Sequence, residues 1–256
     1  MIHYKKLISE VKDLYWLYEN KAIEFDKETI KYAIEKGEEL YKLYDKIAYK
    51  FDKELIEMAI NKGKDLYHLY IKKVDEMDKE LIKKAILKGD DTYVIYNRKG
   101  NEFDEKLLEF AIKNEKDLNS LFSNPNLKLN NKELLLLAIK NCKNRFDYEK
   151  LYNNYAKYFD RELIKLAMEK GEGLYYLYQN ANENFDKELY KMAIEKDEYL
   201  DVLFENANEN FDKELYKMAI EKDEYLDVLF ENANENFDKE LYKMAIEKDE
   251  YLDVLF

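Results

Sequence analysis

The stretch that decides the fold is FDKELYKMAIEKDEYLDVLFENANEN, which occupies residues 185–210. It recurs without a single change at residues 211–236, and a third copy fills residues 237–256. The repeat length is therefore 26 residues, and looser copies fill most of the remaining chain. Self-similarity at a fixed period of this size is typical of proteins built from stacked supersecondary units.

Each copy opens with the signals of a helix start. In the copy that begins at Phe25, Asp26 is placed to accept hydrogen bonds from the first free N–H groups, as an N-cap residue does. Glu28 lies in the first turn, where the positive end of the helix dipole favours a carboxylate. Gly37 stands where a left-handed C-cap belongs. These signals predict a first helix of about ten residues, or roughly three turns.

A second, shorter helix is predicted to carry Leu40, Tyr41, Leu43 and Tyr44, with a polar loop at 45–50. Apolar residues in both segments recur at spacings of three and four, which is typical of helices and not of strands. One such hairpin buries too little apolar surface to offset the conformational entropy lost on folding. We therefore expect an all-α fold, an α-solenoid of about ten stacked 26-residue helical hairpins.

The regular rhythm is interrupted once. Residues 123–126 contain the only proline, the following helix is apolar on more than one face at 134–139, and the loop near 141–145 is about three residues longer than its counterparts. A harmless insertion in one solenoid is the alternative to a true joint. The expected divisions are an N-terminal array at 1–122, an irregular unit or joint at 123–158, and a C-terminal array at 159–256.

Charge is distributed unevenly along the chain. The net charge is −13, and residues 185–256 hold 22 acidic and 9 basic side chains, a balance of −13. Residues 1–184 therefore hold 34 of each sign and are balanced. The C-terminal array is acidic from residue 185, which disfavours direct binding of nucleic acid. The content of 46% hydrophobic residues excludes a disordered chain.

The sequence shows no constellation for catalysis or metal binding. The chain has two histidines, and neither lies near Cys142, so no base stands beside that thiol in sequence. The loop at 180–186 resembles the first half of a calcium loop, but Phe185 replaces the required glycine and Lys191 the bidentate glutamate. We expect a protein that is not an enzyme and has no catalytic residue, no metal site and no cofactor.

The expected location is the cytoplasm. The N-terminal residues lack the continuous apolar segment of a signal peptide. The longest apolar run, at 134–139, is too short to cross a bilayer. A single cysteine excludes a framework of disulfides within the chain and suits a reducing compartment. We expect a soluble protein without a membrane partner.

Tyrosine, with 24 copies, is the most informative side chain. One tyrosine position in the second helix becomes phenylalanine in the last copies and is expected in the core. A second position accepts aspartate in the last copies, so we expect it to be exposed to solvent. Its residues are Tyr15, Tyr41, Tyr67, Tyr93 and Tyr175, followed by Asp201, Asp227 and Asp253. Rings that merely flank the core and pack between units are the alternative.

These features favour a scaffold that binds another protein along its solenoid surface, because tyrosine is a favoured anchor in protein interfaces. The alternative is an acidic decoy or phage-type inhibitor that occupies a basic nucleic-acid-binding surface of another protein. A spacer array with a drifting number of copies is a further hypothesis. Self-association through the uncapped C-terminal end, at 255–256, is also compatible with the sequence.

The unit resembles a bacterial repeat family of unknown function built on the theme D-K-E-V-V-x-x-A-V-x-x-x-G-x-x-L. The matching residues are Asp52-Lys53-Glu54-Leu55-Ile56, Ala59-Ile60, Gly63 and Leu66. The resemblance implies helical repeats and no catalytic residue. The last copies depart from it, because aspartate replaces the glycine at Asp197, Asp223 and Asp249.

Overall fold

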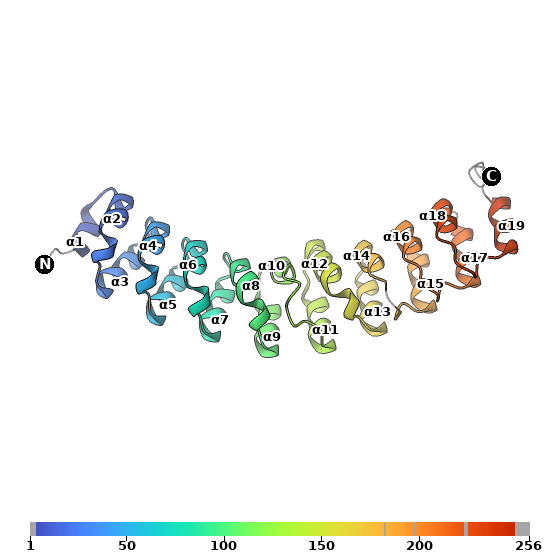
Figure 1. Ribbon diagram of the computed structural model, residues 1–256, viewed down its shortest axis with the longest axis horizontal. Coiled ribbons are helices and arrows are strands. Elements are labelled where there is room, and N and C mark those ends of the chain that lie inside the picture. The colour runs from blue at the N-terminus through green and yellow to red at the C-terminus, as the bar shows by residue number, and fades with distance from the viewer. Residues whose placement is uncertain (1–3, 182, 197, 223–224, 249–256) are drawn as a thin grey trace. The chain divides into compact units, whose positions relative to one another are not determined.

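The computed structural model describes residues 4–181, 183–196, 198–222 and 225–248. These residues form 19 α-helices and five short 3-10 helices, with no strand among them (Figure 1). The predicted all-α repeat fold is therefore confirmed. The chain divides into two compact units, which we call unit 1 (residues 1–128) and unit 2 (residues 129–256).

In unit 1 the helices are α1 (Tyr4–Glu10), α2 (Leu14–Lys21), α3 (Lys27–Lys36), α4 (Leu40–Ile47), α5 (Lys53–Lys62), α6 (Leu66–Lys73), α7 (Lys79–Lys88), α8 (Tyr93–Lys99), α9 (Glu105–Asn114) and α10 (Leu118–Phe122). In unit 2 they are α11 (Lys132–Asn141), α12 (Arg145–Tyr155), α13 (Arg161–Lys170), α14 (Leu174–Gln179), α15 (Lys187–Lys196), α16 (Leu200–Glu205), α17 (Lys213–Lys222), α18 (Leu226–Glu231) and α19 (Lys239–Lys248). The 3-10 helices are η1 (Ala22–Glu24), η2 (Ala48–Lys50), η3 (Val74–Glu76), η4 (Gly100–Glu102) and η5 (Ala156–Tyr158).

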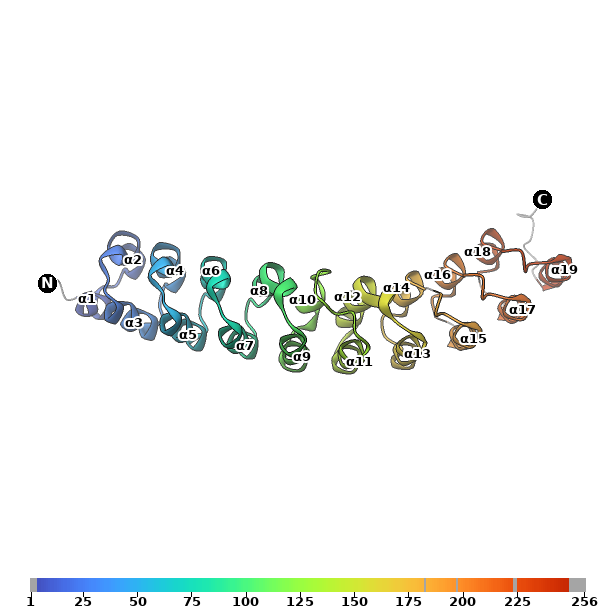
Figure 2. The same cartoon turned by 60° about the horizontal axis from the view of Figure 1, so that its bottom comes forward.

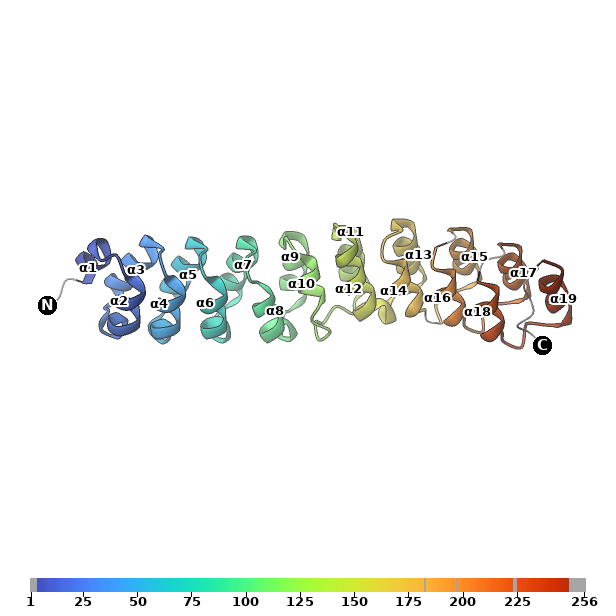
Figure 3. The ribbon, with the colours of Figure 1, turned by 90° about the horizontal axis from the view of Figure 1, so that it is seen from above.

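Each unit is a stack of helical hairpins with two rows of helices. In unit 1, odd-numbered helices α1 to α9 pack one after another along one row, and even-numbered helices α2 to α10 form the other (Figures 1 and 2). In unit 2, helices α11 to α19 and α12 to α18 repeat this arrangement (Figure 3). Each helix therefore contacts its counterpart in the next hairpin, as expected for a solenoid.

The first helix of each hairpin begins and ends as its sequence predicts. The Asp26 carboxylate accepts a hydrogen bond from the Thr29 N–H at 2.8 Å. Gly37 has φ of 73° and closes α3 with a hydrogen bond to Ala33. A Cβ at Gly37 would lie 2.1 Å from the Cε of Lys62, so glycine also makes room for a lysine of the next hairpin. Lys62 Nζ donates to the Glu35 carbonyl at 2.5 Å and so caps the end of α3.

The predicted polar loop at 45–50 is wrong. Helix α4 continues to Ile47, and residues 48–50 form the 3-10 helix η2. Ile47 and Ala48 are almost fully buried, so two further apolar residues join the core of the hairpin. Their burial stabilises the longer helix, whereas a polar loop would have left them in water.

The predicted long loop at 141–145 is also wrong. Only residues 142–144 separate α11 from α12, as many as the three that separate α3 from α4. The extra residues instead lengthen α12, which has 11 residues. Asn144 caps this helix by accepting from the N–H groups of Phe146 and Asp147. The buried Asp147 carboxylate accepts in turn from the Lys143 N–H at 2.8 Å.

The boundary between the two units falls between Lys128 and Leu129, inside the segment 123–158. Within unit 1, Asn124 in the proline-bearing turn is buried, and its side-chain N–H donates to the Tyr96 carbonyl at 2.6 Å. This contact fixes the turn to the preceding hairpin. The division into two arrays and a joint stays a prediction.

A buried tyrosine recurs at the same position of the second helix in successive hairpins and forms part of their core. Tyr44 packs edge-on against Phe51, with ring centroids 5.9 Å apart, and equivalent pairs recur along both units. Where a phenylalanine opens a hairpin, it therefore contacts the second helix of the hairpin before it. The fully buried tyrosines at this position are Tyr18, Tyr44, Tyr70, Tyr96, Tyr152 and Tyr178. The prediction that this ring belongs to the core is confirmed.

Most hydroxyls of these buried tyrosines lack a hydrogen-bond partner among the described residues, as at Tyr44 and Tyr70. Tyr96 differs, because its hydroxyl donates to the carboxylate of Glu115. Glu115 takes the place of the capping glycine in its own hairpin and is itself buried. One acidic side chain thus satisfies a buried hydroxyl that its counterparts leave unpaired.

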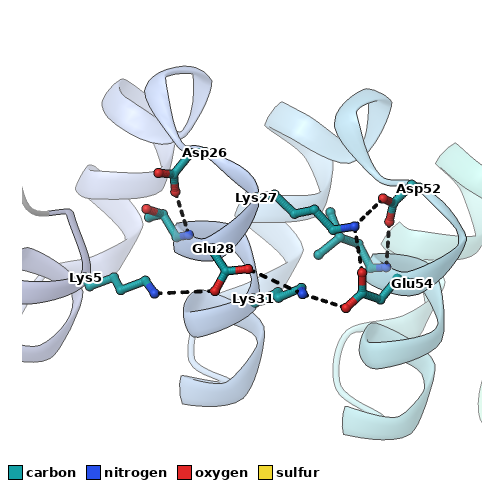
Figure 4. Close-up of polar contacts among 9 residues, drawn as sticks. Lys5, Asp26, Lys27, Glu28, Lys31, Asp52 and Glu54 are labelled. Carbon is teal, nitrogen blue, oxygen red and sulfur yellow. Dashed lines mark hydrogen bonds and ion pairs between the residues drawn. The ribbon is translucent and has the colours of Figure 1, made fainter.

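A row of ion pairs links successive first helices (Figure 4). Lys27 Nζ lies 2.6 Å from a carboxylate oxygen of Asp52 and 2.6 Å from one of Glu54 in the next hairpin. Lys53 repeats the contact with Asp78 at 2.6 Å. In unit 2, Lys187 binds Asp212 at 2.7 Å and Glu214 in the same way. The D-K-E motif therefore caps its own helix and also pairs with both neighbouring hairpins.

Lowering the pH is expected to destabilise the stacks through this row. The lysine of the preceding hairpin is the main cause of a lowered pKa at Asp52 and at Asp78. Because each pKa is lower in the folded than in the unfolded chain, this stabilisation is complete above the unfolded value of about 3.9. It is lost as the pH falls through the folded value. Urea unfolding across a pH series measures it.

Lys53→Gln provides the matched control, because it removes the lysine that lowers the pKa of Asp78. The variant should lose less stability than the wild type over the acidic range. Equal pH dependence of the two proteins would contradict the assignment.

Replacing buried tyrosines by phenylalanine should have opposite effects at two equivalent sites. Tyr44→Phe removes an unpaired hydroxyl and is expected to be neutral or to stabilise by up to about 1 kcal/mol. Tyr96→Phe removes the hydroxyl that donates to one oxygen of the buried Glu115 carboxylate, while the other oxygen still accepts from the Lys116 and Asp117 N–H groups. The variant should be destabilised by about 1–3 kcal/mol. Phe204 and Phe230 already occupy this position in unit 2. Urea midpoints measure both changes, and an equal loss in the two variants would contradict the explanation.

Candidate protein-binding surface

The structure brings the predicted surface tyrosines of unit 1 together in one continuous row at the starts of the even-numbered helices. Tyr15 and Tyr41 have ring centroids 6.3 Å apart, and so do Tyr67 and Tyr93. His68 closes the gap, with its ring 5.6 Å from Tyr41 and 5.5 Å from Tyr67. We call these five residues the aromatic row.

The row faces solvent while its rings touch one another. The exposed fraction is 45% for Tyr15, 40% for Tyr67 and 41% for Tyr93, and Tyr41 is half-buried. The expected exposure is therefore confirmed at three of the four tyrosines. The alternative, packing between hairpins, also holds in part, because each ring contacts an aromatic side chain of a neighbouring hairpin. One edge supports the stack and the other remains accessible.

The turn before each even-numbered helix positions the row. Asp65 has φ of 54°, and its carboxylate accepts from the Tyr41 N–H of the preceding hairpin at 3.0 Å. Asp91 does the same for the Tyr67 N–H at 3.0 Å. A left-handed conformation is strained for a residue other than glycine, so the surrounding contacts must hold it. Each of these aspartates thus fixes the start of the second helix in the preceding hairpin, and with it the tyrosine of the row that this helix start carries.

Charged groups lie directly beside the row. Lys42 Nζ stands 4.5 Å from the centroid of the Tyr15 ring and 2.6 Å from a carboxylate oxygen of Glu19. In the next hairpin His68 takes the place of Lys42, and its Nδ1 lies 3.2 Å from Asp45. One ring face in this surface is therefore already used to bind a cation.

A cleft of about 510 Å³ opens at the N-terminal end of the row. Tyr15 and Tyr41 form part of its wall. Its charged lining residues are Lys12, Asp13, Glu38, Glu39, Lys64 and Asp65. Four acids against two lysines make the cleft acidic, although residues 1–184 as a whole are balanced.

In the last hairpins of unit 2 the exposed tyrosine lies two residues earlier, in the left-handed turn before the second helix. Tyr199 and Tyr225 have φ of 57° and 55° and are 40% and 48% exposed. The Tyr199 ring lies 6.0 Å from that of Tyr175, which is itself 37% exposed. Gly173 occupies the same turn position without strain. A bulky ring held there at a cost in backbone strain favours a surface role over a structural one.

The expectation of tyrosines and then aspartates at one repeat position misses this exchange of tyrosine and acid, because the exchange involves two positions. Asp201 is half-buried and Asp227 is exposed, each two residues after a left-handed tyrosine. The sequence signal was present, since Glu39-Leu40-Tyr41 becomes Tyr199-Leu200-Asp201. Asp253 lies outside the described residues, as do Asp197, Asp223, Asp249 and the C-terminal end at 255–256.

Part of the acidic excess of unit 2 lies on the even-numbered helices α16 and α18. Carboxylates at the starts of the odd-numbered helices, such as Asp212 and Glu214, pair with a lysine of the preceding hairpin. By contrast, the part of unit 2 that the structure describes provides no ion pair for Asp201, Asp227, Glu205 or Glu231. These four carboxylates remain free to attract a basic surface.

Outside the aromatic row and the acidic side chains, the described residues offer few groups for catalysis or metal binding. Cys142 is half-buried, and burial raises the pKa of its thiol, which keeps it protonated at neutral pH. The described residues contain no group of three histidine, cysteine, aspartate or glutamate side chains that could hold a metal ion. No helix in the described ranges has the length and apolar character needed to span a membrane.

Comparison with protein-family models, curated proteins and solved structures finds no match for this chain. The resemblance to a repeat family therefore stays an expectation. The features of the structure that bear on function are the aromatic row, the cleft beside it and the free carboxylates of unit 2.

Proposed function

We propose that this chain is a non-enzymatic scaffold that binds another protein along the even-numbered helices of unit 1. The single observation that supports the proposal is the aromatic row, a continuous line of partly exposed rings from four successive hairpins. Tyrosine and histidine side chains present apolar area and hydrogen-bonding groups at a low entropic cost, as anchors of protein interfaces do.

The hairpin stack supports such a role because it holds the row rigidly. The helix start behind Tyr41 is fixed by Asp65, and the rings support each other across hairpins. A preordered surface loses little conformational freedom when a partner binds. A reducing cytoplasmic compartment suits this protein, with its single protonated thiol.

The test is a comparison of two quadruple variants. The row variant combines Tyr15→Ala, Tyr41→Ala, Tyr67→Ala and Tyr93→Ala. The control variant replaces by alanine four exposed apolar residues outside the row, Ile23, Tyr49, Leu87 and Tyr158. Native lysate is passed over each immobilised protein, and captured proteins are identified by mass spectrometry. We expect a specific partner to be retained by the wild type and the control and reduced about tenfold or more on the row variant.

Circular dichroism must show equal helix content in both variants. Retention of the same partners by a folded row variant would exclude the row as the binding surface.

A second candidate function is an acidic decoy that occupies a basic nucleic-acid-binding surface of another protein. The free carboxylates on α16 and α18 favour it, because they concentrate negative charge on one side of unit 2. In this function the acidic hairpins bind the partner and the tyrosines have a minor role. The two proposals therefore predict different sensitive residues.

Neutralising two of these acids tests the decoy. Asp201→Asn with Asp227→Asn should weaken binding of a basic partner and reduce its dependence on salt. Glu195→Gln with Glu221→Gln, on odd-numbered helices, removes the same charge and serves as the control. Affinity is measured across a salt series by biolayer interferometry. Equal weakening by both pairs would show a general charge effect and exclude a specific decoy surface.

A further inference from the structure

We propose that the cleft beside Tyr15 and Tyr41 binds arginine side chains of an extended partner segment in which every second residue is basic. The inference rests on the proposed function and names the chemistry of the partner. It follows from three properties of the cleft: its aromatic wall, its acidic lining and the spacing of the rings.

Two acids of the cleft, Asp13 and Asp65, are held by hydrogen bonds and can still accept further ones. One Asp13 oxygen accepts from the Trp16 N–H at 2.9 Å, and one Asp65 oxygen from the Tyr41 N–H at 3.0 Å. Each carboxylate has a second oxygen for a guanidinium. Lys64 Nζ donates to the Gly37 carbonyl at 3.0 Å, and together with Lys12 it offsets only two of the four carboxylates. The site therefore offers oriented negative charge to a cation.

The tyrosine rings select the kind of cation. Lys42 already lies over Tyr15, which shows that a cation can rest against a ring of this row. An arginine guanidinium is planar and weakly hydrated, so it stacks on a tyrosine and still donates sideways to a carboxylate. A lysine ammonium is compact and strongly hydrated, and it gains less from the same wall.

The spacing of the rings selects the shape of the segment. Tyr15 and Tyr41 come from successive hairpins, and their centroids are 6.3 Å apart. Tyr67 and Tyr93 repeat this separation of 6.3 Å. Alternate residues of an extended chain point the same way and are about 6.6 Å apart. Arginines at positions i and i+2 can therefore meet successive rings, whereas arginines at i and i+3 point to opposite sides.

The probes are three fluorescein-labelled peptides of equal length: RSRSRSS, RSSRSSR and LSLSLSS. The first two have the same composition and differ only in the spacing of arginine. Fluorescence anisotropy with the full chain should show binding of RSRSRSS about tenfold tighter than that of RSSRSSR. Equal affinity for the two spacings, or equally tight binding of LSLSLSS, would overturn the inference.

Two sets of variants locate the binding. Tyr15→Leu with Tyr41→Leu keeps apolar bulk but removes the ring faces, and should weaken RSRSRSS binding about tenfold. Tyr49→Leu is the matched control, since Tyr49 is an exposed tyrosine outside the row, and should leave affinity unchanged. Glu39→Gln with Asp65→Asn should weaken binding and flatten its salt dependence. An equal effect of Tyr49→Leu would overturn the assignment to the cleft.

Failure of the inference can be told apart from failure of the proposed function. If no peptide binds while the quadruple row variant still loses its partner, the arginine-binding cleft is excluded and the scaffold remains. If light scattering of the wild type shows a dimer that Tyr15→Leu abolishes, the occupant is a second copy of this chain and the inference is overturned.

Discussion

The structure depends on one constraint: each helical hairpin completes its core and its helix ends only on its neighbour. The phenylalanine that opens a hairpin packs against the tyrosine of the preceding one, as Phe51 does on Tyr44. Polar groups follow the same rule, because Lys62 caps the carbonyl end of α3 and Asp65 caps the start of α4. A hairpin removed from the stack would lose apolar burial and leave these ends in water, so stability belongs to the array.

This constraint explains why the D-K-E motif both caps a helix and forms ion pairs with the two neighbouring hairpins. In D-K-E, the aspartate caps its own helix and accepts from the lysine of the preceding hairpin, and the lysine then binds the next hairpin. The odd-numbered helices are thereby committed to structure. The even-numbered helices also keep side chains that remain accessible to solvent, namely the aromatic row in unit 1 and the free carboxylates in unit 2. A binding surface on that side can vary while the fold stays constant.

The exchange between Tyr41 and Asp201 illustrates this freedom. In both hairpins a tyrosine and an acid stand two residues apart around a left-handed turn, but their order is reversed. In unit 1 the acid in the turn fixes the tyrosine of the hairpin before it. In unit 2 the tyrosine takes the strained position, and the acid follows it on the second helix, where Asp201 is half-buried and Asp227 is exposed. The same backbone thus presents two different electrostatic surfaces.

The sequence by itself determined the period, the helix starts at residues such as Asp26, the left-handed caps such as Gly37 and the buried tyrosines, because these are local signals repeated at a fixed spacing. Only the tertiary structure decided that α4 continues to Ile47 and that the extra residues lengthen α12. It also decided that His68 joins the pair Tyr15 and Tyr41 to the pair Tyr67 and Tyr93. The physical reason is that these outcomes depend on which groups of the next hairpin come within reach. A contact between side chains about 26 residues apart is set by packing, and no local pattern encodes it.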